Sequence, residues 1–589
     1  MRDGLLAQDA DGCAAARGTD DRPSYAWPHG CRRPVGVLLA RAMSSLRSAN
    51  VDRLGGTVFD VLVVGGGING AVSAACLAAR GAKVALIDKG DFASFTSQES
   101  SNLAWGGIKY MESFEFGLVR KLCLSRNHLI RSYPSTVQEI RFYAVHARGF
   151  RHGLLKLVLG TWLYWLIGNF FTRPPRWLTR ATIEREEPII DMGGSDGGFE
   201  YSDAYLHDND ARFVWNFIRG ALNYGCIATN YVEAVGSARG EDGVWVTSAR
   251  DVAGVDGADR SAITIRSRVL LNAGGPFVDP MNAQARVRTA HKHVFSKGIH
   301  LIVDRLTPNR RVLTFFADDG RLFFVIPMGP RTCIGTTDIR VDSPVADVTD
   351  DDRRFVLDNI NKRLRLPRPL GAGDVIAERC GVRPLAVAVD ENQSKRKGKK
   401  TTDWMQLSRK HVVEVNPESK HLSIFGGKLT DCLNVGEEVA EQVRLLGVDL
   451  PYSDARWYGE PPAGARREFW HQAKLMDLDG LTSPRSSEKL TPRLWRRYGA
   501  QAFVLLEDIR RDPRMAEVLI ENAEYLRCEI ELAARHEMVV RLDDFLRRRS
   551  KIALVVSRQA LVDAPGLREA CGLLFGPAAG ARYDEYFAV

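Results

Sequence analysis

The chain has 589 residues, of which 45% are hydrophobic and 26% are charged, and this balance predicts an ordinary globular protein of two or three domains. Its ten cysteines are scattered without a CxxC pair, which excludes a disulfide framework or a zinc site and indicates free thiols in a reducing compartment. The net charge of +9 suits an anionic substrate or an anionic membrane surface. No nucleic-acid motif accompanies it, so we expect no nucleic-acid partner. We also expect no metal.

Residues 1–56 differ in composition from the rest of the chain. They are rich in Ala, Arg, Gly and Asp and show no clear periodicity. The apolar patch near residues 35–43 is too short for a signal peptide with a convincing cleavage site, and the aspartates argue against a transit peptide. We therefore expect an extension that is disordered or non-native, with Met43 as an alternative start.

A glycine-rich turn, GGGING at residues 65–70, follows an apolar strand at residues 59–64 and leads into a small-residue helix at residues 69–80. A second strand at residues 83–87 ends in Asp88, about 20 residues after the turn. This order of strand, glycine turn, helix, strand and acid predicts a dinucleotide site in a doubly wound α/β domain. The alternative is a glycine loop that only closes a tight turn between strand and helix.

Each of three glycines in the turn has its own expected role. Gly65 makes the tight turn, Gly67 lets a pyrophosphate approach the backbone, and Gly70 lets the helix pack closely on the strand. The helix N-terminus offers free N–H groups and a partial positive charge to the phosphates. Asp88 is placed to accept hydrogen bonds from a ribose hydroxyl.

Two further stretches are expected to lie beside the cofactor. A polar loop at residues 91–102, rich in Ser and Thr and including Ser101, follows the second strand and is placed to fold over the cofactor. An apolar strand at residues 267–272 ends in Ala273 and Gly274, as in the later half of a dinucleotide-binding fold.

Residues 140–183 contain seven basic residues and no acidic one. Within them, residues 154–171 are apolar and aromatic, are barely long enough to span a bilayer, and contain Lys156. Aromatic residues with flanking arginines are typical of a helix that lies in the headgroup region, so we expect residues 148–180 to face a membrane surface. A buried core helix with a basic rim and a true membrane span are the alternatives.

The rest of the chain divides into a strand-rich part and a helical part. A helix is predicted at residues 114–133, and alternating strands fill residues 293–338, as in an antiparallel sheet. The basic run at residues 395–400 is expected to be a solvated loop, with a binding role as the alternative. From about residue 463 the sequence predicts helices with arginine-rich faces and no strands.

Short motifs occur in one order over most of the chain. They are VVGGGINGA (residues 63–71), GGIKYME (106–112), GFEYSD (198–203), DAR (210–212), NAGGP (272–276), GIH (298–300), IGTTD (334–338), GVRP (381–384), FGGKLT (425–430) and RHEM (535–538). Together they resemble the FAD-dependent glycerol-3-phosphate dehydrogenases, respiratory flavoenzymes that make dihydroxyacetone phosphate. The resemblance implies FAD, glycerol 3-phosphate as substrate, a monotopic position on the cytoplasmic face of a membrane and re-oxidation by membrane quinone, and it leaves a homodimer open.

Oxidation of a secondary alcohol needs a hydride acceptor, a base for the hydroxyl proton and groups that hold the substrate. With the resemblance, we predict His300 as the base, since an imidazole with a pKa of about 6.5 takes up a proton near neutral pH. Arg383 offers a planar fork suited to phosphate oxygens, and Lys109 adds a point charge. Arg409 is a weaker third candidate, and the alternative for each cation is a surface ion pair.

The stretch GGKLT at residues 426–430 follows an apolar strand and opens a helix. We expect this helix N-terminus to stabilise negative charge on the reduced flavin, with Gly427 and Thr430 at the cofactor. Lys428 adds to that charge stabilisation or touches the substrate. The alternative is another tight turn between strand and helix.

Three positions depart from the family pattern. Relatives usually carry Lys where Asn102 stands, His at Trp105 and Arg at Lys109. Replacing Arg by Lys removes bidentate recognition, and the loss of the other two cations makes the mouth of the site less positive. These departures leave another phosphorylated or carboxylated hydroxy compound open as the substrate.

The expected fold is α/β: a doubly wound, Rossmann-like FAD-binding domain with an inserted antiparallel-sheet substrate domain and a C-terminal helical domain. The FAD-binding parts are residues 57–285 and 376–450, the substrate-domain strands are residues 286–375, and the helical domain is residues 463–589. Two other functions stay open. One is a soluble flavin oxidase that acts on an amine or hydroxy acid with oxygen, and the other is a non-catalytic flavin-binding sensor.

Overall fold

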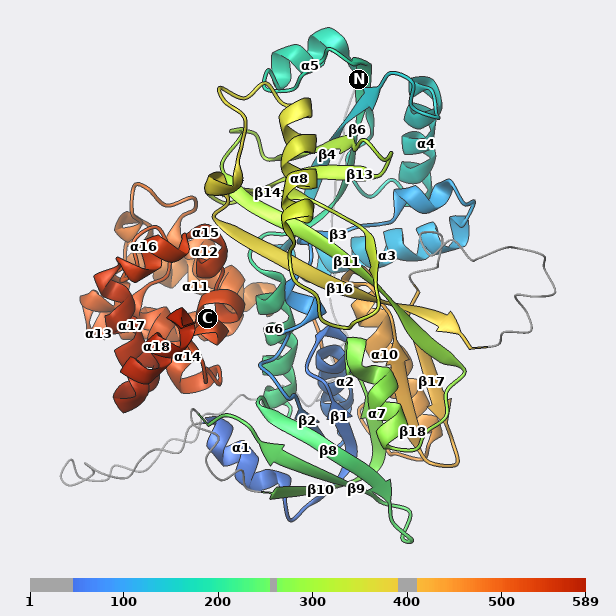
Figure 1. Cartoon of the computed structure of the whole chain (residues 1–589). Helices are drawn as coiled ribbons and strands as arrows, with labels where there is room; N and C mark the ends of the chain where they lie inside the picture. The colour runs from blue at the N-terminus through green and yellow to red at the C-terminus, as the bar shows by residue number, and fades with distance from the viewer. Residues whose placement is uncertain (1–45, 255–261, 390–409, 589) are drawn as a thin grey trace, which may run out of the picture. The chain divides into compact units, whose positions relative to one another are not determined.

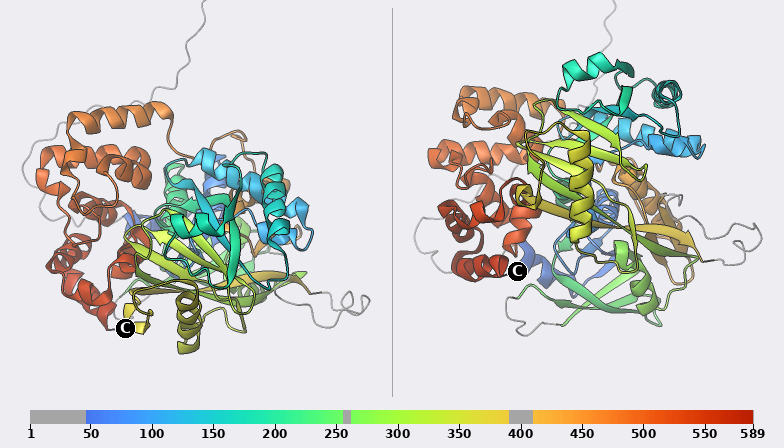
Figure 2. Two further views of the ribbon diagram at one scale, coloured as in Figure 1. Left: turned by 90° about the horizontal axis from the view of Figure 1, so that it is seen from above. Right: turned by 45° about the horizontal axis from the view of Figure 1, so that its top comes forward.

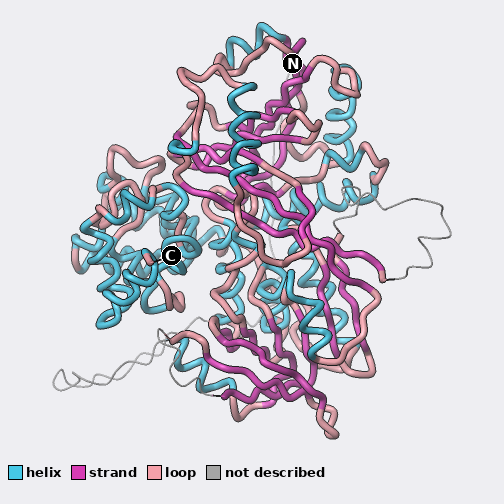
Figure 3. The backbone as a smooth tube through the Cα atoms, viewed as in Figure 1, coloured by secondary structure: helices cyan, strands magenta, loops and turns pink. Residues whose placement is uncertain are grey.

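The computed structural model describes residues 46–254, 262–389 and 410–588. Two β-sheets and a C-terminal helical region make up this part of the chain (Figure 1). Figure 3 shows the strands of the two sheets and the C-terminal helical region, which contains no extended strand. These are the three parts that the sequence predicts.

The first sheet carries the glycine-rich turn. Its central strand β1 (Val58–Val64) lies between β2 (Val84–Ile87) and β10 (Ala262–Asn272), and all three run parallel. On the two sides β7 (Ile227–Thr229) pairs with β2, and β18 (His421–Phe425) pairs with β10, both in parallel. The antiparallel strands of this sheet are β8 (Val232–Arg239), β9 (Trp245–Asp251) and β17 (Val412–Asn416).

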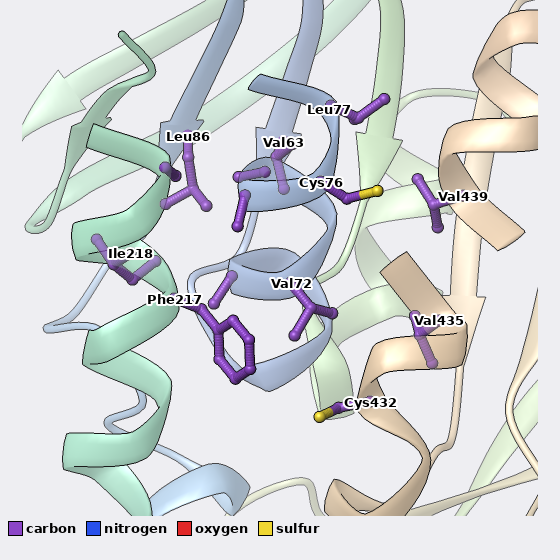
Figure 4. Packing of buried hydrophobic residues seen from close by; sticks show 14 of the residues in the cluster. Val63, Val72, Cys76, Leu77, Leu86, Phe217, Ile218, Cys432, Val435 and Val439 are labelled. Carbon is purple, nitrogen blue, oxygen red and sulfur yellow. The ribbon is translucent and has the colours of Figure 1, made fainter. Parts of the chain in front are cut away.

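Helix α2 (Ile68–Ala79) packs between α6 (Asp210–Asn223) and α10 (Cys432–Leu445) on one face of the first sheet. Figure 4 shows Val72 and Cys76 of α2 in this layer, with side chains of α6 and α10 on either side. The small residues of α2 are almost all buried, so its neighbours approach closely. The eight cysteines of the described residues are free thiols, and most of them lie in cores of this kind.

The other face of the first sheet is covered by β8, β9 and helix α1 (Leu46–Leu54) rather than by a second set of long helices. In α1, Arg47 forms an ion pair with Asp251 at 2.6 Å, and Asn50 donates to the carbonyl of Ala228 at 3.0 Å. These contacts correct the expectation of a disordered extension for residues 46–54, while residues 1–45 lie outside the described residues. Hydrophobic periodicity does not indicate this helix, because it has few apolar residues and polar contacts hold it in place.

The second sheet is mixed rather than purely antiparallel. Its long strands β11 (His291–Asp304) and β16 (Ala377–Ala388) pair antiparallel over twelve residues of each. The exception to antiparallel order is β4 (Val137–Ala147), which runs parallel to β12 (Arg311–Phe316). The remaining strands are β3 (Leu103–Ala104), β5 (Arg176–Thr179), β6 (Ser195–Leu206), β13 (Leu322–Met328), β14 (Arg331–Gly335) and β15 (Ile339–Val341).

The strand pairing differs from the expected domain boundaries. Strands β3 to β6 lie within residues 57–285, and β16 lies within residues 376–450, yet all of them pair in the second sheet. Hydrophobic periodicity identifies a strand but not the partner beside it, so the sequence did not reveal that the chain passes between the sheets several times.

The helices around the second sheet divide between its faces. Helix α8 (Asp350–Arg363) buries Val356 and Ile360 against the face that carries Ile299 and Leu301. Helices α3 and α4 pack into the core on the opposite face. The helices of this part are α3 (Phe116–Ser132), α4 (Leu154–Ile167), α5 (Arg180–Glu186) and α7 (Val278–Gln284).

The C-terminal region consists of helices joined by turns and loops (Figure 2). A six-residue π-helical turn, Asp544–Arg549, interrupts it and is fully buried. The helices are α11 (Ala463–Leu475), α12 (Leu490–Tyr498), α13 (Ala502–Arg511), α14 (Arg527–His536), α15 (Ile552–Val555), α16 (Arg558–Val562), α17 (Pro565–Phe575) and α18 (Ala579–Phe587).

Candidate active site

The turn after β1 has the geometry that only glycine allows. Gly65 has a φ of +110°, and a Cβ atom there would lie 2.5 Å from the Ala273 carbonyl oxygen. A Cβ atom on Gly70 would lie 1.8 Å from the Gly65 carbonyl oxygen. Gly67 is the N-cap of α2 and no side chain caps this end, although the Ile68 N–H donates to Ser97. The turn therefore fits a pyrophosphate at the start of α2.

Asp88 is held against this turn. One carboxylate oxygen accepts a hydrogen bond from the Gly66 N–H at 2.6 Å, and the other accepts from the Gly90 N–H at 2.8 Å. Burial raises the pKa of Asp88 to about 6, and the two backbone N–H groups oppose that rise. Asp88 thus ties the end of β2 to the glycine turn, and its contact with a ribose stays a prediction.

The loop at residues 91–102 is bonded directly to the glycine turn. The Ala93 N–H donates to the Gly66 carbonyl at 3.1 Å, and the Ser97 hydroxyl accepts from Ile68 at 3.0 Å. Ser101, further along the loop, is half-buried. The loop is therefore placed where the sequence expects a cofactor cover.

The C-terminal region contacts this same loop, and the sequence did not predict that contact. Asp91 is fully buried and accepts a bond from Arg548 at 2.7 Å and two bonds from Arg549 at 2.8 Å each. Arg547 forms an ion pair with Glu99 at 3.2 Å. The run of three arginines was visible in the sequence, but nothing local indicated a partner about 450 residues away.

The end of β10 meets the glycine turn. The Ala273 N–H donates to the Val64 carbonyl at 2.9 Å, and the Gly274 N–H donates to the Asn272 side chain at 3.1 Å. Ala273 is buried and its carbonyl oxygen is the atom nearest to Gly65. Ala273 and Gly274 thus lie beside the turn, as the sequence predicts for residues next to the cofactor.

His300 lies on β11, on the face of the second sheet that also carries the core side chains Ile302 and Cys333. It is 2% exposed, and neither ring nitrogen has a hydrogen-bond partner among the described residues. Burial, and to a smaller extent the positive charges of Arg379 and Arg383, lower its pKa to about 3. The imidazole is therefore neutral at physiological pH.

Arg383 lies one strand away from His300, on β16. Its guanidinium covers Gly298, where a Cβ atom would lie 2.0 Å from one of the terminal nitrogens. It donates to Asp338 at 3.3 Å and to the Thr336 hydroxyl at 3.1 Å. The structure thus brings this predicted phosphate ligand onto the pair of strands that carries His300.

Two of the other predicted residues meet around one tyrosine. The Lys428 ammonium lies 4.1 Å from the centre of the Tyr110 ring, and the Lys109 ammonium lies 5.5 Å from it. Thr430 donates to the Trp105 carbonyl at 3.3 Å, so the stretch at residues 426–430 contacts the loop before Lys109. Gly427 has a φ of +111° and is exposed. Arg409 and the basic run at residues 395–400 lie outside the described residues.

The residues that depart from the family pattern have defined contacts. Asn102 is fully buried, donates to the Leu206 and Asp208 carbonyls, and accepts a bond from Arg379 at 2.8 Å. Trp105 packs edge-on against Phe324 and its ring N–H donates to the Tyr201 hydroxyl at 3.4 Å. Asn102 and Trp105 are therefore integrated into the protein interior rather than offering cations to a substrate.

Comparison with known proteins identifies the family. Residues 60–401 match the model described as FAD dependent oxidoreductase, and residues 439–572 match the C-terminal domain of alpha-glycerophosphate oxidase. Glycerol-3-phosphate dehydrogenase 2 of Mycobacterium tuberculosis is 30% identical over 533 residues, which cover 86% of this chain and 83% of that protein. The chain belongs to the FAD-dependent glycerol-3-phosphate dehydrogenase family.

A second relative and a solved structure show how far the similarity extends in sequence and in fold. D-erythritol 1-phosphate dehydrogenase of Brucella abortus is 29% identical over 507 residues, which cover 84% of this chain and 94% of that protein. The glycerol-3-phosphate dehydrogenase of Bacillus halodurans complexed with FAD superposes with a TM-score of 0.67 at 22% identity, over 93% of this chain and 97% of that one. This structural likeness supports the fold.

Membership of the glycerol-3-phosphate dehydrogenase family confirms the resemblance and the fold class drawn from the sequence, with the second sheet mixed. It also establishes FAD as the cofactor and an FAD-dependent oxidoreductase as the class of enzyme. The glycine turn, Asp88 and the loop at residues 91–102 provide a backbone cradle that fits the cofactor's pyrophosphate.

Proposed function

We propose that this enzyme oxidises the C2 hydroxyl of sn-glycerol 3-phosphate to the ketone of dihydroxyacetone phosphate, and that the electrons pass from FAD to a membrane quinone. The observation that carries the proposal is the buried, neutral imidazole of His300 on β11 next to the Arg383 guanidinium on β16. A base and an anion-binding fork on adjacent strands suit a substrate whose hydroxyl lies close to its phosphate.

FAD supplies the acceptor for the hydride when it is bound. His300 accepts the hydroxyl proton at one of its ring nitrogens, both of which are open among the described residues. The phosphate dianion brought in by Arg383 offsets the positive charges that lower the pKa of His300, so substrate binding makes this base stronger. Arg383 fixes the phosphate, and Lys109 and Lys428 add positive charge from the side of Tyr110.

Anaerobic titration of the FAD-loaded protein with phosphorylated polyols tests the proposal. We expect glycerol 3-phosphate to bleach the flavin absorbance more efficiently than D-erythritol 1-phosphate, glycerol or an amino acid. One relative is named for D-erythritol 1-phosphate, so preferential bleaching by this compound would assign it as the substrate in place of glycerol 3-phosphate. Peroxide formed in place of reduced quinone would favour the oxidase, and a flavin that stays yellow with every compound would favour the sensor.

Replacement of Arg383 by Gln should raise KM for glycerol 3-phosphate about 10- to 100-fold and change kcat little. A charged hydrogen bond contributes about 1.5–3 kcal/mol, and a phosphate fork holds ground and transition states alike. Steady-state kinetics with a quinone analogue measures both constants. Arg365→Gln is the matched control, because that arginine is exposed and pairs with Asp191 at 3.3 Å. An unchanged KM would place the phosphate elsewhere.

Helix α4 provides the surface that we propose for the membrane. No helix of the described residues is long and apolar enough to cross a bilayer. α4 buries Val158, Thr161 and Tyr164 and exposes several of its other apolar side chains. Between 44% and 61% of each of these side chains is exposed: Leu155, Leu159, Trp162 and Leu166. An apolar face of this kind is typical of a helix that lies in the headgroup layer.

The charges around α4 are weaker than the sequence suggested. Arginines of this segment pair with acidic residues from elsewhere in the chain, including Arg148 with Asp196 and Arg151 with Glu112, both at 2.6 Å. The apolar face therefore supplies most of the proposed membrane affinity. The buried Tyr164 of α4 donates to Asp203, which also accepts from the Gly106 N–H, so the helix packs against the loop that contains Gly106. This position suits electron transfer to quinone at a cytoplasmic membrane face.

Replacement of Leu159 by Glu should weaken binding to phospholipid vesicles about tenfold or more. Burying one leucine side chain contributes about 1.5–3 kcal/mol, and a carboxylate adds a desolvation cost. Vesicle co-sedimentation at several lipid concentrations gives the partition constant. Leu475→Glu is the control, because Leu475 is an exposed leucine of α11. Equal binding of the two variants, or none by the wild type, would contradict a membrane role for α4.

A further inference from the structure

Arg379 is a buried arginine at the reaction centre that the proposed mechanism does not use. It stands on β16 directly opposite His300 on β11, and such cross-strand pairs place their side chains on one face of the sheet. Only 1% of its surface is exposed. It shares this face with His300 and thus lies at the same site.

The guanidinium of Arg379 uses only part of its hydrogen-bonding capacity. One terminal nitrogen, Nη1, donates to the Ser100 carbonyl and, at 2.8 Å, to the Asn102 side chain. The other terminal nitrogen, Nη2, forms a 3.8 Å ion pair with Asp210 without a hydrogen bond, and Nε has no hydrogen-bond partner among the described residues either. Buried N–H groups are rarely left unsatisfied, so these two nitrogens point to an acceptor that the protein itself does not supply.

The contacts of Nη1 place the guanidinium at the cofactor loop. Ser100 and Asn102 flank Ser101, and the same loop is bonded to the glycine turn through Ala93 and Ser97. Arg379 therefore connects the loop at residues 91–102 to β16, the strand that pairs with the strand of His300.

Arg379 also contacts Asn102, one of the positions that depart from the family pattern, because the Asn102 side-chain oxygen accepts from it. The buried positive charge beside this part of the loop is therefore supplied by β16.

We propose that Arg379 is a further catalytic residue, which stabilises through its Nε and Nη2 groups the negative charge that the flavin acquires on reduction. Hydride transfer adds negative charge to the flavin ring, and a fixed buried cation stabilises that charge without reorganisation. The flavin is favoured over the substrate as the acceptor because the guanidinium is anchored to the cofactor loop. The inference rests on FAD, which the family establishes, and goes beyond the proposed choice of substrate.

The two-electron midpoint potential of the bound flavin tests this role, measured with a chemical reductant and redox dyes in the absence of substrate. We expect Arg379→Gln to weaken binding of reduced FAD relative to oxidised FAD at least tenfold, which lowers the potential by about 30 mV or more. Arg379→Lys keeps the charge and should recover most of the loss. Arg353→Gln is the control, because Arg353 pairs with Glu378 of the same strand at 2.6 Å.

Each outcome decides the matter. If Arg379→Gln does not retain FAD, the Lys variant decides, because it keeps the charge but has fewer donors, and its potential should lie measurably below that of the wild type. A potential equal to that of the wild type in the variants that bind FAD overturns the proposal, whether or not KM rises. Because no substrate is present, failure of glycerol 3-phosphate to reduce the enzyme would leave this result unaffected.

Discussion

Replacement of His300 by Gln should slow reduction of the flavin by substrate about 10²- to 10⁴-fold and leave substrate affinity nearly unchanged. A positioned base contributes a factor of this size, and Gln keeps much of the volume but accepts no proton. The loss is expected mainly in kcat, because His300 is not the group that binds the phosphate. Anaerobic stopped-flow at several substrate concentrations separates the rate of reduction from the dissociation constant.

His471→Gln provides the matched control for this measurement, because His471 is an exposed residue of α11. The His300 variant should also lose the part of the pH dependence of flavin reduction that reports protonation of the base. Reduction at the normal rate in His300→Gln would show that another group takes the proton. Its unpartnered nitrogens would then need a different explanation.

Replacement of Arg549 by Met should lower the free energy of unfolding by about 3–5 kcal/mol and weaken FAD binding. The substitution removes two of the three arginine hydrogen bonds to the buried Asp91 carboxylate and leaves its charge with Arg548 as the remaining arginine partner. Arg549 also donates to the Glu537 carbonyl at 2.9 Å and lies over the Trp215 ring, so several contacts are lost together. Urea unfolding gives the stability, and flavin fluorescence gives the dissociation constant of FAD.

The control for this variant is Arg511→Met, which removes an exposed ion pair with Glu507 in the same helical region. Such pairs contribute about 0–1 kcal/mol, so stability should change little. A stability loss in Arg549→Met with unchanged FAD affinity would show that the arginines hold the C-terminal region but not the cofactor loop.

The local elements of the cofactor site could be predicted from the sequence. The glycine turn, the helix after it and the acid at the end of β2 lie within residues 59–88, and each follows from short-range rules of turn and helix formation. Membership of the two sheets could not be predicted in the same way. The pairing of β4 with β12, for example, joins residues about 170 positions apart, and no local pattern encodes it.

The same division applies to the site. His300 and Arg383 were found because each stands in a short motif that resembles a family pattern, and the structure brings both onto paired strands. Arg379 was missed because it has no motif of its own. Its significance depends on the strand opposite and on Asn102, which only the folded chain brings together.

The ion pairs of Arg548 and Arg549 with Asp91 form only after most of the chain has been synthesised. These partners are separated by 457 and 458 positions, so at 5–20 residues per second the ribosome needs between about 20 and 90 s to make the second after the first. Throughout that interval the nascent chain exposes its glycine turn without the finished cover. We therefore expect stable binding of FAD to follow completion of the chain, because a polypeptide that ends before residue 547 lacks the arginines that hold the loop at residues 91–102.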